Sequence, residues 1–173
     1  MEKIFALIKQ MEADGVIGRY AIAGSVGALF WMETNTTLGI DVFVSLPHSS
    51  GSAPLTLGAI YEYLLARGCE TRAEYVIIEG WPVQFVPPGT PLVEEALAEA
   101  VERDVDGVST RIFTAEHLAA ICLQVGRDKD HYRLTKFIEE DALDATKFEA
   151  ILSRHGLLEK WRRFGQQSRP SEL

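Results

Sequence analysis

Cysteine is scarce in this chain, which limits both its redox chemistry and its metal chemistry. Cys69 and Cys122 are the only two cysteines in the sequence. They stand alone, without the close spacing of a zinc site and without the many partners of a disulfide-rich secreted domain. We therefore expect both side chains to be ordinary core or surface thiols.

The sequence also lacks a long apolar run. No stretch is long enough to cross a bilayer, and the first residues show no signal-peptide pattern. Residues 1–11 instead carry apolar side chains at helical spacing and predict an amphipathic helix. These features predict a cytoplasmic protein that has no membrane partner.

Positive charge is in short supply as well. The formal net charge is −8, and no Lys or Arg occurs between Tyr20 and Ala66. Proteins bind nucleic-acid backbones through clustered Lys and Arg, so nucleic acid is not expected as a general ligand. The hydrophobic fraction of 47% is nevertheless ordinary for a globular protein.

The most informative stretch lies between residues 20 and 44. Small or apolar residues at 21–23 end at Gly24, as a buried strand ends at a turn. Gly24 can adopt backbone angles closed to other residues and lets a ligand approach the main chain. Ser25 can cap the helix that follows, whose free N–H groups attract phosphate.

Asp41 lies inside a second predicted strand. Its neighbours are apolar and mostly β-branched, in a run too apolar for a surface strand. A carboxylate there is costly unless it is hydrogen-bonded, paired or bound to a metal. Considered without Gly24 and Ser25, a solvated aspartate at the rim of a sheet explains the position about equally well.

This succession resembles the front half of the active site of nucleotidyltransferases of the DNA polymerase β superfamily. There a strand ends in Gly-Gly or Gly-Ser, a helix follows, and the next strand carries an Asp-x-Asp motif. The resemblance, which extends over residues 20–164, implies an α/β fold with a mixed sheet flanked by helices. It also implies two-metal transfer of a nucleotide, in which carboxylates hold the divalent ions.

The carboxylates of that motif are incomplete in this chain. Asp41 matches the second aspartate, whereas Gly39 stands at the first position and Gln84 stands where the third carboxylate is expected. Glu79, near the turn of a predicted hairpin, is a weaker substitute, because a solvated glutamate is the commoner explanation. We expect Asp41 to be both catalytic residue and metal ligand, to bind Mg²⁺ weakly, and to gain affinity from an aspartate at position 39.

Residues 126–130 read Gly-Arg-Asp-Lys-Asp. They resemble a segment of bacterial nucleotidyltransferase-like proteins, including toxins of abortive-infection systems. The resemblance implies that Arg127 and Lys129 contact phosphates and that Asp130 orients one of them. Since residues 20–66 supply no cation, Arg127 or Lys129 should face Asp41 and Ser25.

The alternative for residues 126–130 is a simple helix start. Asp128 would cap the helix, and Lys129 and Arg133 would form ordinary surface pairs. His117, on a predicted apolar helix, is better explained as a packing histidine than as a base. Residues 47–54, which include His48, form a polar loop that fits either an active-site flap or a plain surface loop.

The order of predicted elements divides the chain into two regions. Residues 1–113 alternate helices and strands, including a hairpin at 74–86 with its turn at 80–81, a helix at 92–101 and a strand at 108–113. Residues 114–173 are almost wholly helical, with helices at 115–125, 128–139, 145–154 and 157–164. This pattern predicts an α/β core with a C-terminal helical region packed on it.

Two functions remain open from the sequence. The first is an enzyme, or its remnant, that transfers NMP from Mg-NTP to a protein or small acceptor. The second is a non-catalytic nucleotide-binding or regulatory module that keeps the fold and has a protein partner. Gly39 and Gln84 favour the second function. The predicted site residues are Asp41, Gly24, Ser25, Arg127, Lys129 and Asp130.

Overall fold

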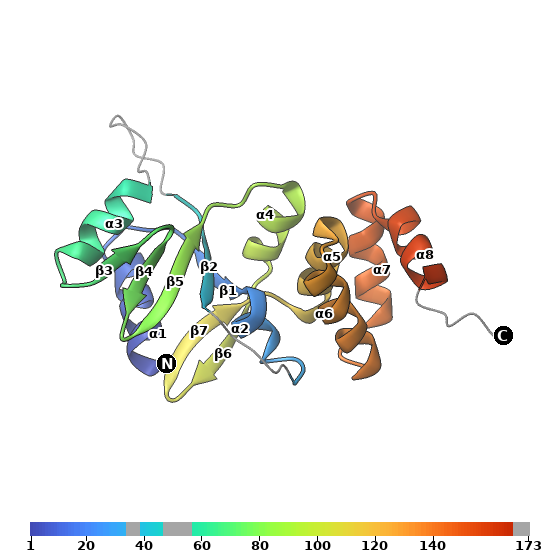
Figure 1. Ribbon diagram of the computed structural model, residues 1–173, viewed down its shortest axis with the longest axis horizontal. Helices are drawn as coiled ribbons and strands as arrows, with labels where there is room; N and C mark the ends of the chain where they lie inside the picture. Colours follow the sequence, from blue (N-terminus) through green and yellow to red (C-terminus); the bar gives the residue numbers. More distant parts are fainter. Residues whose placement is uncertain (34–38, 47–56, 168–173) are drawn as a thin grey trace.

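The computed structural model describes residues 1–33, 39–46 and 57–167. Its helices and strands follow one another along the chain as shown in Figure 1. In chain order they are α1 (Glu2–Ala13), β1 (Tyr20–Ala23), α2 (Gly24–Ala28), β2 (Ile40–Val44), α3 (Leu57–Leu65), β3 (Glu70–Arg72), β4 (Tyr75–Ile78), β5 (Trp81–Val86), α4 (Pro91–Ala98), β6 (Val101–Val105), β7 (Val108–Ile112), α5 (Ala115–Val125), α6 (Asp128–Glu139), α7 (Ala145–Arg154) and α8 (Leu158–Gln167).

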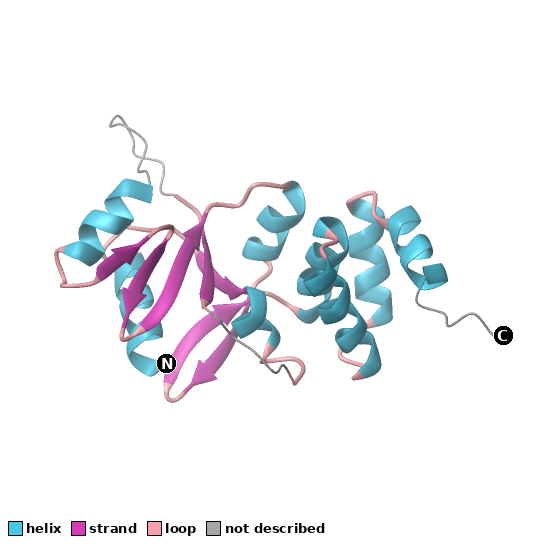
Figure 2. Cartoon of the chain, viewed as in Figure 1, coloured by secondary structure: helices cyan, strands magenta, loops and turns pink. Residues whose placement is uncertain are grey.

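The strands form one mixed sheet of seven, in the order β3-β4-β5-β2-β1-β7-β6. The pairs β2–β5 and β1–β7 are parallel, and the other neighbouring pairs are antiparallel. Helices flank this sheet, and further helices follow it at the C-terminal end, as Figure 2 shows. The predicted α/β fold with a mixed sheet and a C-terminal helical region is therefore confirmed.

Helices α1 and α3 cover one face of the sheet. The predicted amphipathic helix at the N-terminus is α1, which buries Ile4, Phe5, Ile8 and Met11 along one side. Burying a side chain of this size stabilises the fold by about 1.5–3 kcal/mol. These side chains pack with alternate residues of β1 and β2, among them Ile22 and Val42.

The opposite face of the sheet packs against α4 and α5. Ala21, Ala23 and Phe43 point to this side, and the Phe43 and Phe113 rings lie 5.2 Å apart. Side chains alternate along a strand, so Asp41 faces the same way as Phe43. The helices that follow the sheet therefore stand on the face that carries Asp41.

The C-terminal helices begin and end where their capping residues dictate. The Thr114 side chain accepts a hydrogen bond from the His117 backbone N–H and starts α5, which ends at Gly126 in the left-handed conformation. The predicted helices 115–125, 128–139 and 145–154 match α5, α6 and α7. The last helix, α8, packs Trp161 edge-on against Phe148 at a ring distance of 5.1 Å.

Some local predictions differ from the structure. Strands β3 and β6 were not expected, and the helix predicted at 92–101 ends earlier because Val101 begins β6. The hairpin turn lies at Glu79 and Gly80, which both have positive φ, so Trp81 already belongs to β5. Residues 47–54, with His48, lie outside the described residues. No helix in the described ranges has the length and apolarity to cross a membrane.

Candidate functional site

Asp41 lies directly against Gly24. Antiparallel pairing of β1 and β2 sets Ala23 opposite Asp41 and so brings the start of α2 beside its carboxylate. A Cβ atom on Gly24 would overlap Asp41 Oδ2 and lie 2.9 Å from its Cγ, and Gly24 has a φ of +60°. This position therefore needs glycine for its backbone angle and for the space that the carboxylate fills.

Parallel pairing of β2 and β5 places Gln84 beside Asp41 in register. The third-carboxylate position of the sequence analysis is thus occupied by a neutral amide. Position 39, where the first aspartate of the motif is expected, has little room for a side chain. A Cβ on Gly39 would lie 2.9 Å from the Pro82 carbonyl oxygen. An aspartate at 39 would have to displace the β5 backbone, so its expected gain in metal affinity is not supported by this geometry.

Glu79 does not replace the absent carboxylates. Its side chain pairs with Lys3 Nζ at 3.4 Å, and both side chains are exposed. Lys3 belongs to α1, which covers the face of the sheet opposite Asp41. Glu79 is therefore a surface residue, as its commoner explanation predicted.

The direct contact between α6 and the start of α2, where Gly24 and Ser25 lie, comes from Arg133. Its Nη2 donates a hydrogen bond of 2.8 Å to Ser25 Oγ, although the two residues are 108 positions apart. This contact differs from the alternative explanation of residues 126–130, in which Arg133 would form an ordinary surface pair. A signal was available, since Arg133 lies one helical turn after Lys129 and shares its face of α6.

Arg127 and Asp130 form the start of α6. Arg127 is the N-cap residue. The backbone N–H of Arg127, at 3.3 Å, and its Nε, at 2.6 Å, both donate hydrogen bonds to the buried Asp130 carboxylate. Asp128 is therefore not the cap. Burial alone would raise the pKa of Asp130, but the hydrogen bonds and charge of Arg127 lower it below its ordinary value.

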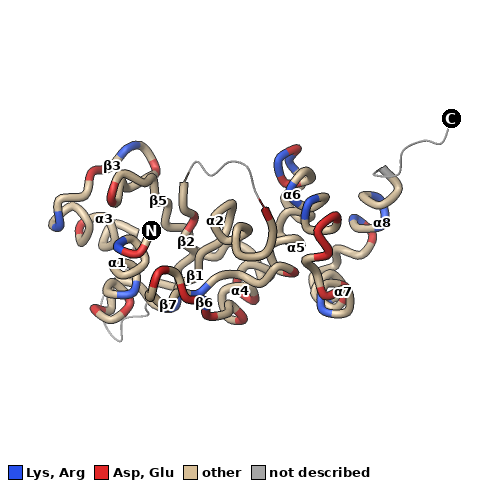
Figure 3. Tube along the Cα trace, turned by 90° about the horizontal axis from the view of Figure 1, so that it is seen from below, with Lys and Arg blue, Asp and Glu red and all other residues tan. Residues whose placement is uncertain are grey.

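Three cations act on Asp41. Burial raises the pKa of the Asp41 carboxyl above its ordinary value, and the charges of Arg133, Lys129 and Arg127 oppose this rise. Figure 3 shows Lys and Arg residues along α6. The two basic residues of 126–130 thus lie within electrostatic reach of Asp41, while Arg133 makes the direct contact with Ser25.

Cys122 lies under Arg133 on α5. Burial raises the pKa of its thiol to about 11, and the nearby charge of Arg133 opposes this rise. The thiol is therefore neutral and supplies no negative charge. Among the residues that the structure describes, no carboxylate forms an ion pair with Arg133.

The residues around Asp41 do not fit a pair of divalent ions. Two-metal catalysis needs several carboxylates to hold both ions. Here Asp41 has a neutral amide beside it at Gln84 and a backbone carbonyl against Gly39. Mg²⁺ is often held by one or two carboxylates plus phosphates and waters, so the described residues around Asp41 fit at most one ion.

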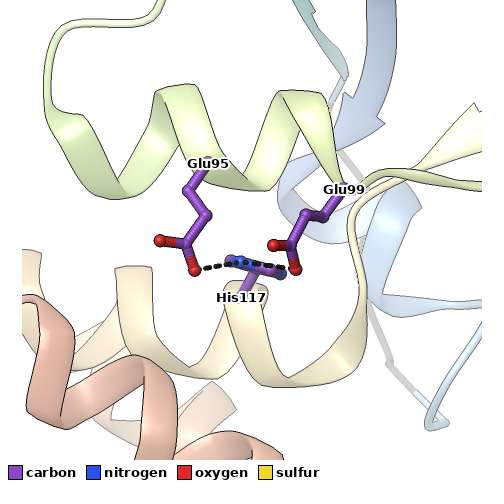
Figure 4. Close-up of side chains that lie close together, drawn as sticks. All are labelled: Glu95, Glu99 and His117. Atoms are coloured by element: carbon purple, nitrogen blue, oxygen red, sulfur yellow. Dashed lines mark hydrogen bonds and ion pairs between the residues drawn. The ribbon is translucent and has the colours of Figure 1, made fainter.

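A second cluster of ionisable side chains lies between α4 and α5. Glu95, Glu99 and His117 bring three ligand atoms within 4.8 Å of one another, a spacing compatible with a metal ion (Figure 4). His117 Nε2 lies 3.2 Å from Glu95 Oε1 and 3.9 Å from Glu99 Oε2. This group does not include Asp41.

Glu95 already has other partners. Arg154 Nη2 lies 2.6 Å from its Oε1, and His155 Nε2 lies 2.8 Å from its Oε2. Hydrogen bonds from Arg154, with those of both histidines, lower the pKa of Glu95 to about 2. The Nδ1 atom of the buried His117 lies 2.8 Å from Thr114 Oγ1. The cluster ties α4, α5 and α7 together, and His117 is the packing histidine that the sequence indicated.

A small apolar hollow lies farther along the helical region. Its volume is about 170 Å³, and it lies among α6, α7 and α8. Phe137, Phe148 and Trp161 line it. None of the predicted site residues borders this hollow.

Comparison with known proteins supports the class of fold. The structure is similar to the crystal structure of an antigenic nucleotidyltransferase-like protein from Paracoccidioides brasiliensis, with a TM-score of 0.60 and 14% sequence identity. The match covers 95% of this chain and 89% of that one. No protein-family model and no curated protein matches the sequence. The chain has a nucleotidyltransferase-like fold, and the resemblance to bacterial toxins stays a prediction.

Proposed function

We propose that this protein binds a nucleotide at the sheet face between Asp41 and Arg133, and that its transfer of NMP from Mg-NTP to a protein or small acceptor is weak or lost. The observation that carries the proposal is the hydrogen bond of 2.8 Å from Arg133 to Ser25. It brings an arginine to the turn where a nucleotidyltransferase-like fold receives its ligand.

The helical region supplies the cations that residues 20–66 lack. In this proposal residues 114–173 form a unit that packs on a core of residues 1–113. Arg133, Lys129 and Arg127 all come from that unit and act on Asp41. In this proposal they contact the phosphates, Asp130 orients Arg127, and Gly24 and Ser25 admit the ligand to the backbone. The helix α2 has only five residues, so the Ser25 hydroxyl matters more than a helix dipole.

The weak transfer follows from the carboxylate set. Metal ions contribute several kcal/mol of transition-state stabilisation to such reactions, and each 1.4 kcal/mol is about a factor of ten in rate. Among the described residues of the site, Asp130 is already bound by Arg127, so Asp41 is left to hold one Mg²⁺ weakly. The residues around Asp41 thus suit ligand binding better than chemistry.

A second function is favoured by the same residues. Gln84 stands in register beside Asp41, and Gly39 is packed on the β5 backbone. Both features fit a cytoplasmic regulatory or interaction module that keeps the fold and recognises a protein partner. The two functions differ in whether any product forms.

Nucleotide binding is tested with an arginine variant and a matched control. Calorimetric titration with Mg-ATP and the other Mg-NTPs should show saturable binding. Arg133→Ala should weaken this binding about 10–100-fold, which corresponds to the loss of one hydrogen bond to a charged group. Arg162→Ala is the control, because Arg162 is exposed on α8 and pairs only locally with Glu159. Equal affinities for the wild type and Arg133→Ala would exclude this site.

Transfer is tested separately. Incubation with labelled NTPs and Mn²⁺ should give no labelled product, or a trace that Asp41→Ala removes. Strong labelling that persists in Asp41→Ala would show that Asp41 is not the catalytic residue.

A further inference from the structure

We infer that the site holds a phosphate group directly through Arg133 and Lys129, without a divalent ion, so that its preferred ligand is a nucleoside monophosphate rather than a metal-bound triphosphate. The inference rests on the proposed nucleotide site.

The charges on the described residues favour a ligand of low charge. Arg133, Lys129 and Arg127 act on Asp41, and Asp130 is bound to Arg127. These three cations and two carboxylates together carry one net positive charge. A phosphate monoester carries about −1.5 to −2 at neutral pH, which is nearer to balancing this charge than a triphosphate is. A triphosphate carries much more negative charge and would need additional cations.

Arg133 has the geometry and the environment of a phosphate ligand. It is half-buried, it donates a hydrogen bond to the Ser25 hydroxyl, and among the described residues no carboxylate forms an ion pair with it. A guanidinium has five N–H donors in a planar fork that matches two oxygens of a phosphate. Partial burial strengthens such a contact, because less water competes for the donors.

The carboxylate side of the site does not favour metal. Asp41 is fixed against Gly24, and its neighbour Gln84 is neutral. The Gln84 amide can instead donate a hydrogen bond to a phosphate or sugar oxygen, which a glutamate at this position would repel. Arg133 and Lys129 supply positive charge, and Gln84 supplies a neutral donor. Together they suit a phosphate that is not bound to a metal ion.

Calorimetry with the full-length protein tests this inference. The probes are the 5′-monophosphates and 5′-triphosphates of the four ribonucleosides, each in EDTA and in Mg²⁺. At least one monophosphate should bind with a Kd that changes less than about 2-fold between EDTA and Mg²⁺. Arg133→Ala should weaken that binding at least about 10-fold, and Arg133→Lys, which keeps the charge without the fork, by an intermediate factor. Arg162→Ala should bind as the wild type does.

The outcomes separate the two proposals. If triphosphates bind with Mg²⁺ at least about 10-fold more tightly than any monophosphate, the metal-free inference is overturned and the proposed nucleotide site stands. If an unphosphorylated nucleoside binds as well as its monophosphate, phosphate recognition is wrong. If no nucleotide binds under either condition, the proposed function fails as well. Should Arg133→Ala not fold, Arg133→Lys alone decides the role of the fork.

Discussion

Two clusters of charged residues contact α5, and they differ in how completely their charges are paired. Near its N-terminus, Glu95 accepts hydrogen bonds from Arg154 and His155 and lies against His117. Toward the C-terminus of α5, Cys122 is buried near Arg133. Arg133 donates a hydrogen bond to Ser25 and forms no ion pair with a carboxylate among the described residues. The first cluster is closed by its own residues, whereas the second has donor capacity left for a ligand.

This contrast shows that a shifted pKa does not by itself identify a functional site. The pKa of Glu95 falls to about 2 because arginine and histidine partners hold its charged form in place. The pKa of Asp41 rises because burial outweighs three nearby cations that do not pair with it. Charges that lie near one another without pairing indicate a ligand better than a strong internal bridge does.

The largest expected effect is a loss of stability that tests how tightly the Asp41 carboxylate packs against Gly24. Gly24→Ala should destabilise the protein by about 2–3 kcal/mol, because the new methyl meets the Asp41 carboxylate at a positive φ. In an Asp41→Ala background the same substitution should cost only about 1 kcal/mol, the backbone strain alone. Urea denaturation of the four proteins measures the coupling. Additive effects would show that the two side chains do not compete for one space.

The next effect tests whether the Glu95 cluster is structural. Its depressed pKa means that Glu95 contributes stability above its unfolded pKa, near 4.5, and loses it as the pH falls toward 2. Glu95→Gln should remove about 1–2 kcal/mol at pH 7, allowing for solvent screening around Arg154, and almost nothing near pH 2.

Melting curves between pH 2 and pH 7 check this expectation. Glu94→Gln is the control, because Glu94 lies on the same helix and forms no ion pair within the described part of the chain. If Glu95→Gln and Glu94→Gln follow the same pH curve, the cluster does not tie the helices together.

A third substitution should increase the metal affinity of the residues around Asp41. Gln84→Glu places a second carboxylate in register beside Asp41 and should raise Mn²⁺ affinity about 10-fold. Gly39→Asp should give no such gain, because its Cβ would meet the Pro82 carbonyl oxygen at 2.9 Å. Calorimetric titration with Mn²⁺ ranks the two variants. A larger gain from Gly39→Asp would mean that β5 yields more easily than its packing suggests.

The smallest effect concerns Lys129. Because it is an exposed point charge, Lys129→Ala should weaken binding of the best monophosphate only about 2–5-fold. Its melting temperature should stay within a degree of the wild type. A loss as large as that of Arg133→Ala would move the main phosphate contact from Arg133 to Lys129.

The fold was predictable where local rules decide it. Helices α5 and α7 have capping residues at Thr114 and Asp144 and apolar residues at helical spacing, so their bounds follow from the sequence. Strand β6 reads Val-Glu-Arg-Asp-Val and lies at the edge of the sheet, where charged residues are tolerated. Its partners in space, not its composition, make it a strand.

The candidate site was predictable only in its sheet half. Gly24, Ser25 and Asp41 follow from a strand, a turn and an apolar run that are all local. The contact of Arg133 depends on how α6 is oriented over the sheet, which no local pattern contains. Asp130 was expected to orient a cation, and its hydrogen bonds to Arg127 are consistent with that role, but they also cap the helix.

The hydrogen bond between Ser25 and Arg133 has a consequence for folding cooperativity. It joins residues 108 positions apart, so the proposed binding site forms only after the helical region has docked on the sheet. A ligand held there would stabilise the docked state, by about 2.7 kcal/mol at a concentration 100 times its Kd. The nucleotide would then act as a clamp, making the sheet and the C-terminal helices unfold as one cooperative unit.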